Sequence, residues 1–276
     1  MSFKGNGFCF ETGKRTYIMG VLNITPDSFY DGGRYNSIDR AVSHLRRLEM
    51  DGADIIDVGA NSTNPEVEIL SVKDELKVIG DMLPEIIKAT AVPVSVDTFY
   101  PEVARFALES GAKIINDVSG IINPEMLKLI KKHKAGYTVM HNPLFSSKEA
   151  ADYTECGGVA NSVEAFFENC EKELENAGIS KEQVLFDIGI GFSKNQFDDN
   201  ELLKNMSTFR KEGRALLVAL SNKRVTSVLP DMTKADRLYS TIAYDTLAIA
   251  GGADFIRVHN VREAKIAAEA ADRIVR

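Results

Sequence analysis

The chain has 276 residues, of which 44% are hydrophobic and 26% are charged. This length suits one large hydrophobic core, so we expect a single domain over residues 1–276. A formal net charge of −7 argues against a nucleic-acid partner. No apolar run reaches the roughly 20 residues that span a bilayer, and the first residues lack a signal-peptide pattern, so we expect no membrane partner and a cytoplasmic location.

The first predicted element is a short hairpin. An Asn-Gly pair, Asn6-Gly7, stands between the aromatic residues Phe3 and Phe8, and Asn-Gly is typical of a tight two-residue turn. We expect this hairpin to cover the N-terminal end of the domain that follows.

The rest of the chain alternates between two patterns. Short apolar or β-branched runs predict eight strands: 17–23, 54–59, 93–97, 113–118, 136–140, 184–187, 216–219 and 255–259. Apolar residues spaced three and four apart predict eight helices: 37–51, 71–89, 101–110, 124–134, 161–177, 198–211, 234–250 and 262–275. Ser71 is expected to cap its helix, which then begins with acidic residues.

This alternation predicts parallel strands joined by right-handed crossovers. Eight such units in one domain usually close into a (β/α)₈ barrel, the α/β fold that we expect; a doubly wound open sheet is the alternative. The connections 24–36 and 60–70 are long and rich in polar residues or glycine, which is typical of functional loops.

Every predicted strand ends in polar residues. They are Asn23, Asp57, Asp97, Asn116 with Asp117, His141 with Asn142, Asp187, Ser221 to Lys223, and Arg257 with His259. Contact with water or helix capping would explain any one of them. Because the C-terminal strand ends of such a barrel surround its active site, the whole set predicts one shared pocket.

The residue types indicate what this pocket binds. Carboxylates and carboxamides such as Asp97, Asn116 and Asp187 offer two planar hydrogen-bonding atoms each, which suits the donor and acceptor edge of a flat heterocycle. Lys223 could donate to a ring oxygen or nitrogen, and Arg257 could stack on the ring face. The sequence therefore predicts a small heterocyclic ligand.

A second group of side chains suits an anion. Arg257, His259 and Asn23 would form a polar wall, and metal binding through Asp57 or Asn23 is possible. No tight His/Asp cluster demands a structural metal. We expect any ion to be Mg²⁺ shared with a phosphate.

These residues resemble those of the dihydropteroate synthases, from Tyr17 to the end of the chain. The matching stretches are MGVLNITPDSFYDGG from Met19, GADIIDVGANSTNP from Gly52, SVDT from Ser95, AKIINDVSG from Ala112, VMHN from Val139, FDIGIGFSKN from Phe186, LSNKR from Leu220 and FIRVHNV from Phe255. The resemblance implies a pterin-binding (β/α)₈ transferase of folate synthesis. Such an enzyme joins 6-hydroxymethyl-7,8-dihydropterin pyrophosphate to the aromatic amine para-aminobenzoate and releases pyrophosphate, assisted by Mg²⁺, and is commonly a dimer.

The resemblance also implies roles for individual residues. The pterin pocket would use Asp97, Asn116, Asp187, Lys223 and Arg257. The pyrophosphate would meet Asn23, Arg257 and His259, with Asn23 also at the metal. Two loops would close over the site, the first with Pro26, Asp27 and Phe29 and the second with Thr63 and Pro65. The acceptor would lie near Ser221 and Arg224.

Three positions depart from the family pattern on the acceptor side. Asn64 and Asn222 stand where the family has arginines, and Arg224 stands where it has a serine. We therefore expect an intact pterin side and impaired use of para-aminobenzoate. A synthase-like paralogue with weak or different transferase activity and a pterin-binding protein, or a methyltransferase-type pterin domain, stay open as alternatives.

Overall fold

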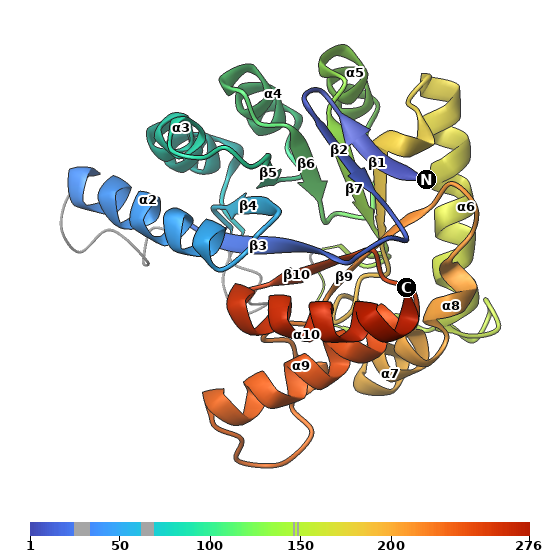
Figure 1. Ribbon diagram of the computed structural model, residues 1–276. Helices are drawn as coiled ribbons and strands as arrows, with labels where there is room; N and C mark the ends of the chain where they lie inside the picture. Colours follow the sequence, from blue (N-terminus) through green and yellow to red (C-terminus); the bar gives the residue numbers. More distant parts are fainter. Residues whose placement is uncertain (25–33, 62–68, 146, 148) are drawn as a thin grey trace.

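The computed structural model describes residues 1–24, 34–61, 69–145, 147 and 149–276 (Figure 1). In these residues eight parallel strands form a closed barrel in the order β10-β3-β4-β5-β6-β7-β8-β9. The strands are β3 Tyr17–Asn23, β4 Ile55–Gly59, β5 Val94–Asp97, β6 Ile114–Asp117, β7 Gly136–Met140, β8 Val184–Asp187, β9 Ala215–Ala219 and β10 Phe255–Val258. The predicted barrel and all its strands are confirmed.

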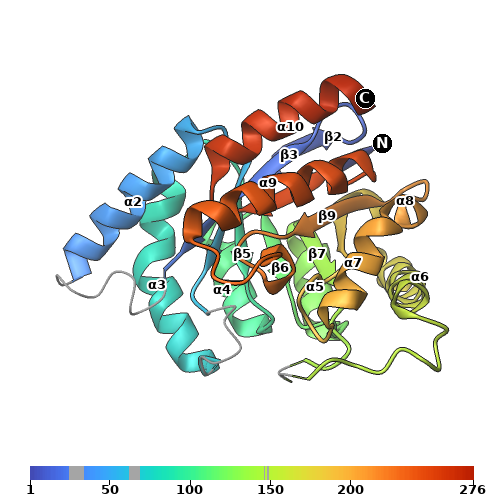
Figure 2. The ribbon, with the colours of Figure 1, turned by 90° about the horizontal axis from the view of Figure 1, so that it is seen from below.

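Helices surround the barrel and connect its strands (Figures 1 and 2). The described ones are α2 Arg34–Met50, α3 Val72–Lys88, α4 Pro101–Ser110, α5 Pro124–His133, α6 Val159–Ala177, α7 Gln196–Lys204, α8 Met206–Phe209, α9 Lys234–Ala250 and α10 Val261–Val275, with the 3₁₀ turns η2 Lys181–Gln183 and η3 Arg224–Thr226. Ser71 caps α3 as expected, because its side chain accepts from the Asp74 amide. Among the helices of the described ranges, none is long and apolar enough to cross a membrane.

One predicted helix is wrong in its extent. The segment 198–211 forms two helices, α7 and α8, which meet at Asn205. The Asn205 side-chain amide donates to the Glu201 carbonyl at 2.8 Å and helps to end α7 there. A side chain that bonds its own backbone in this way competes with a continuous helix.

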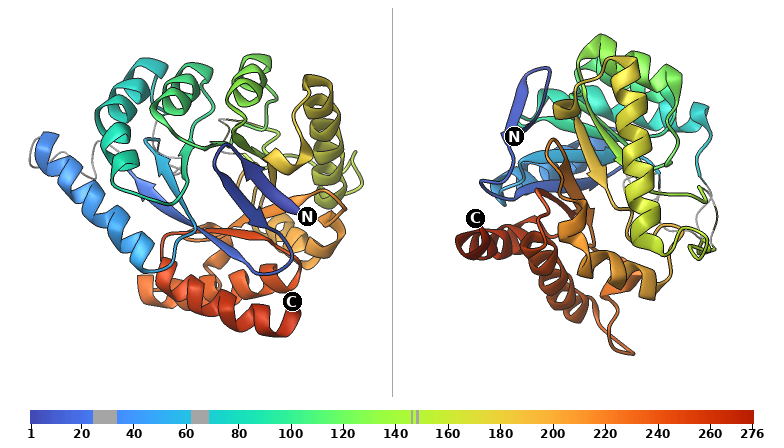
Figure 3. Two further views of the ribbon diagram at one scale, coloured as in Figure 1. Left: turned by 45° about the horizontal axis from the view of Figure 1, so that its top comes forward. Right: turned by 90° about the vertical axis from the view of Figure 1, so that its right-hand side faces the viewer.

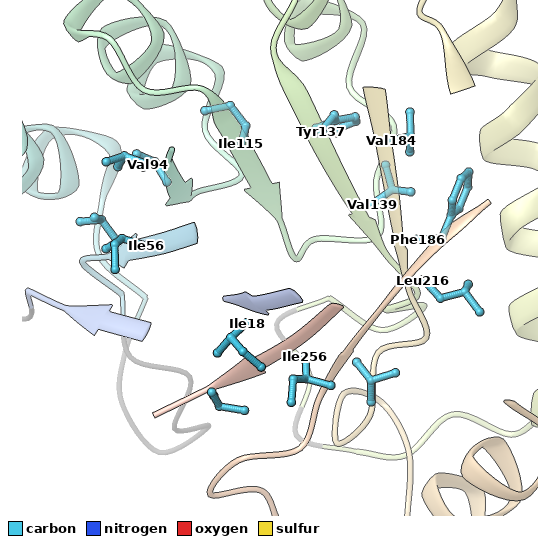
Figure 4. Close-up of a cluster of buried hydrophobic side chains, with 14 of the residues drawn as sticks. Ile18, Ile56, Val94, Ile115, Tyr137, Val139, Val184, Phe186, Leu216 and Ile256 are labelled. Atoms are coloured by element: carbon cyan, nitrogen blue, oxygen red, sulfur yellow. The ribbon is translucent and has the colours of Figure 1, made fainter. Parts of the chain in front are cut away.

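Strand side chains alternate between two layers, since successive residues of a strand point to opposite faces. The outward set packs with the helices in one large core, and Figure 4 labels ten of its side chains on successive strands, among them Ile56, Ile115 and Ile256. The inward set forms a second, smaller core within the barrel, which includes Met19 and Leu217. This alternation decides which polar strand-end residues can reach the inside.

The predicted hairpin is present as β1 Ser2–Gly5 and β2 Phe8–Glu11, and it lies across one end of the barrel (Figure 3). Phe3 and Phe8 join the inner core, and the Phe3 ring meets Phe255 edge-on with centroids 5.5 Å apart. A Cβ on Gly136 would lie 2.7 Å from Phe3, so only glycine leaves room for this ring. The hairpin therefore closes the end of the barrel opposite to the C-terminal strand ends.

A buried arginine links the barrel to α6. The Arg214 side chain is 0% exposed and donates to Glu164 and Glu171, each at 2.8 Å. Its guanidinium carbon also lies 5.4 Å from the centroid of the Phe167 ring. Because both glutamates are partly buried, loss of the arginine would leave two acceptors poorly solvated.

We therefore expect Arg214→Met to lower the free energy of unfolding by about 3 kcal/mol. Lys211→Met is the matched control, since Lys211 pairs with the same Glu164 from an exposed position. Its loss should cost less than about 1 kcal/mol. Urea unfolding of both variants measures the difference, and equal losses would contradict the role of burial.

Candidate active site

The inward layer brings polar side chains together at the C-terminal strand ends. Asp57 alternates with the outward residues Ile56 and Val58, and Arg257 with Ile256 and Val258. The same rule turns three further predicted residues inward, Asp97, Asn116 and Asp187. Asp97 and Asn116 are direct partners in the register of β5 and β6. These five residues form the mouth cluster.

Arg257 is the centre of the mouth cluster. Its Nε donates to Asp57 Oδ2 at 2.6 Å, and its NH2 group donates to Asp97 Oδ2 at 2.9 Å. Asn116 Nδ2 donates to the same Asp57 oxygen at 3.1 Å. Side chains from four strands are thereby fixed relative to one another before any ligand binds.

Two oxygens of this cluster have no partner among the described residues. Asn116 Oδ1 and Asp57 Oδ1 are both buried without a hydrogen bond. Buried acceptors without donors are rare in folded proteins and cost free energy. A ligand with N–H groups at its edge would satisfy them.

Asp187 of the mouth cluster and Lys223 together form what we call the polar floor of the site. Asp187 Oδ1 accepts from the Gly189 amide at 2.7 Å. Lys223 Nζ donates to the Ile190 carbonyl at 2.7 Å and lies 4.6 Å from the centroid of the Phe192 ring. The loop after β8 therefore holds the predicted lysine beside the strand-end carboxylates.

Burial dominates the electrostatics of the site. It raises the pKa of Asp97 to about 7, against the attraction of Arg257, and the nearby carboxylates Asp57 and Glu75 add to the rise. Burial also raises the pKa of Asp187 and lowers the pKa of Lys223 to about 8, which Asp187 opposes. The pKa values of Asp97, Asp187 and Lys223 are thus all shifted toward neutrality.

The next feature is the polar wall that was predicted to bind an anion through Arg257, His259 and Asn23. The Asn23 and Asp97 side chains both lie next to Gly59. A Cβ atom placed on Gly59 would be 3.8 Å from Asn23 Oδ1 and 3.5 Å from Asp97 Cβ. His259 Nδ1 lies 3.0 Å from Ser221 Oγ. Burial lowers the pKa of His259 to about 4, and the charges of Arg257 and Lys223 lower it further, so the imidazole is neutral at pH 7.

Three strand-end residues do not face the mouth, and the expectation that all of them converge is wrong. Asp117 follows Asn116 and so points outward, where it accepts from the Tyr137 hydroxyl at 2.9 Å. His141 Nε2 lies 3.1 Å from Ser162 Oγ of α6. Asn142 donates to the Val118 carbonyl, which fixes a loop.

The other predicted residues are placed in part. Arg224 is exposed, and its NH2 group donates to the Lys194 carbonyl at 2.7 Å. The predicted loop residues Pro26, Asp27, Phe29, Thr63 and Pro65, and also Asn64, lie outside the described residues.

One buried acid was missed at the site. Glu75 is 0% exposed, accepts from the Asn61 side chain, and has a pKa raised to about 7 by burial. The sequence predicts it as an acid that complements the start of α3. The signal was its place on the buried stripe of that helix, four residues before Ile79.

Comparison with known proteins places this geometry in a family. Residues 19–259 match the family model described as pterin binding enzyme. A dihydropteroate synthase of Clostridium beijerinckii is 36% identical over 97% of this chain and 97% of its own. The chain belongs to the dihydropteroate synthase family. It is accordingly a transferase of folate synthesis, and the resemblance found in the sequence is confirmed.

Solved structures agree with this assignment. A Clostridium difficile dihydropteroate synthase, determined in the presence of pteroic acid, has a TM-score of 0.89 and 34% identity, covering 97% of this chain and 99% of that one. The Xanthomonas albilineans enzyme with 4-aminobenzoic acid has a TM-score of 0.85 and 34% identity, covering 94% and 93%. The barrel and its hairpin are thus the fold of this family.

The raised pKa of Asp97 predicts a pH effect on stability. An unfolded aspartate titrates near about 4, whereas folded Asp97 keeps its proton up to about pH 7. The folded state therefore binds more protons between these values and loses stability as the pH rises. Relative to the original chain, Asp97→Asn should gain on the order of 2 kcal/mol between about pH 4 and about pH 7. Urea unfolding across this range measures the gain, and a difference that is constant with pH would contradict it.

Proposed function

We propose that the mouth cluster binds the pterin of 6-hydroxymethyl-7,8-dihydropterin pyrophosphate, so that its methylene carbon is joined to the amine nitrogen of para-aminobenzoate as pyrophosphate leaves. The observation that carries this proposal is the preassembled cluster with two unpartnered buried oxygens. A pterin edge carries adjacent N–H donors, which Asn116, Asp97 and Asp187 suit as acceptors. Lys223 supplies a donor for a ring acceptor, and the Arg257 plane suits the ring face.

The chemistry needs a stabilised cation more than a base. The bond between the methylene carbon and the pyrophosphate oxygen breaks, and the electron-rich dihydropterin ring delocalises the positive charge. The amine nitrogen then forms a bond to that carbon and afterwards loses a proton. Buried carboxylates around the ring favour the cation electrostatically, and exclusion of water protects it from capture.

We propose Mg²⁺ as the metal, bound through Asn23 and the pyrophosphate oxygens. The Asn23 Oδ1 atom beside Asp97 is a hard oxygen ligand of the type that Mg²⁺ prefers. Magnesium usually takes few protein ligands when phosphates are present. Together with Arg257 it would neutralise charge on the leaving pyrophosphate, whereas His259, which is neutral at pH 7, would contribute a hydrogen bond only.

We expect para-aminobenzoate to bind near the residues that depart from the family pattern. Arg224 begins η3 directly after Lys223, and its bond to the Lys194 carbonyl holds it near the polar floor. The acceptor carboxylate would meet this side chain and Ser221. Thr63 and Pro65 of the second loop, with Asp27 and Phe29 of the first, would complete the closed site.

Assembly and location are further proposals. We propose a homodimer through α9 and α10, which lie side by side (Figure 2). Both helices expose apolar side chains spaced eight residues apart, Tyr239 with Leu247 and Ile266 with Ile274, at exposures of 72%, 63%, 62% and 86%. Such a patch on a soluble protein favours an interface. The cytoplasmic location stays a prediction.

Asp187→Ala tests the pterin site. Loss of a buried acceptor would leave the ring donors unpaired, so pterin affinity should fall about tenfold or more. Calorimetry with a pterin measures the affinity, and Asp39→Ala, at an exposed position of α2, is the control. Unchanged affinity in a folded Asp187 variant would place the pterin elsewhere.

A double variant tests the acceptor side. Asn64→Arg with Arg224→Ser restores the residues of the family at two of the three altered positions, so kcat/KM for para-aminobenzoate should rise while pterin affinity changes little. Product formation from the pterin pyrophosphate, Mg²⁺ and para-aminobenzoate measures it. If the original chain turns over efficiently and the double change lowers its rate, Arg224 is a functional substitute and the use of para-aminobenzoate is not impaired.

A further inference from the structure

A second lysine lies under the site, and the reaction described above does not use it. Lys194, in the loop between β8 and α7, is 3% exposed. Its Nζ donates to three backbone carbonyls, those of His141 at 3.1 Å, Gly189 at 2.9 Å and Phe192 at 3.0 Å. An ammonium group has three hydrogens, so every donor of this buried cation has a carbonyl acceptor.

The loop folds tightly around this ammonium. Gly189, Gly191 and Ser193 all have positive φ, at 70°, 78° and 53°. A Cβ on Gly189 would lie 2.0 Å from the His141 carbonyl oxygen, so the loop presses against the end of β7. Three carbonyl oxygens converge there, and without a donor between them they would be buried and unpaired.

The other side of the same loop holds the site lysine. Ile190 supplies the carbonyl that accepts from Lys223, and Phe192 supplies the ring beneath its ammonium. The Lys194 carbonyl also accepts from Arg224, the residue after Lys223. The positions of Lys223 and Arg224 therefore both depend on the conformation of this loop, which Lys194 stabilises.

We propose that Lys194 is a positioning residue, a built-in cation that shapes the loop 188–193 so that Lys223 and Phe192 are held in place for the pterin. This inference rests on the proposed function. Burial lowers the pKa of Lys194 to about 7 and Lys223 adds to this, whereas three carboxylates, Asp199, Asp187 and Asp198, favour the charged form. A neutral side chain of equal size would fill the space but would donate no hydrogen bonds.

The test compares Lys194→Ala and Lys194→Met with the original chain, and Lys204→Ala, at an exposed position of α7, is the control. Calorimetry measures pterin affinity, and circular dichroism with thermal unfolding reports the fold. Both Lys194 variants should lose about tenfold or more in affinity, while the control loses none. Propylammonium matches the deleted part of the lysine and should restore much of the affinity of Lys194→Ala but none of that of Lys194→Met.

Tetramethylammonium carries the same charge without N–H donors and should rescue neither variant. Wild-type affinity in either folded Lys194 variant would overturn the proposal. If neither Lys194 variant folds, the proposal is overturned too, because the role of Lys194 would then be to stabilise the fold. If the original chain itself binds no pterin, the proposed function fails instead, which separates the two results.

Discussion

The guanidinium of Arg257 holds the active end of this barrel together. It pairs with Asp57 and Asp97, carboxylates that precede it by 200 and 160 residues in the chain. Only closure of the sheet, with β10 beside β3, brings the last strand close to β4 and β5. These hydrogen bonds are desolvated, so their formation depends on geometry that the apolar outer core fixes.

The mouth cluster costs free energy of folding, and a bound ligand can offset part of this cost. Carboxylates outnumber cations at the mouth, burial raises the pKa values of Asp97 and Asp187, and two oxygens have no donor in the described structure. Unfavourable burial of polar groups is typical of binding sites, where the ligand supplies the missing hydrogen-bonding partners. Because the side chains stand on strands, they keep their positions while the loops vary around them.

The sequence predicted the architecture well because both of its patterns are local. Apolar periodicity located every strand of the barrel, and the Asn6-Gly7 turn located the hairpin. Local patterns could not show which of two adjacent polar residues faces inward, so Asp117 and His141 were placed in the mouth. A shift of one residue along a strand reverses its face.

The misses have a common cause. Glu75 resembled an acid that complements a helix start, but tertiary packing buries it beside Asp97. The break at Asn205 and the cage around Lys194 likewise depend on side chains that bond to backbone atoms, which periodicity does not report. The family resemblance supplied the chemistry of the pocket, while the hydrogen bonds that preassemble it required the three-dimensional structure.

A crystal structure of the chain soaked with 6-hydroxymethylpterin tests the central claim most directly. The account predicts density for the pterin edge against Asp97, Asn116 and Asp187, with the Arg257 guanidinium along the ring face. A competing position is the cavity of about 470 Å³ that Phe99, Tyr100 and Phe145 line together with Ser71 and Asp74. Density in that cavity, with the mouth cluster unchanged, would contradict the account.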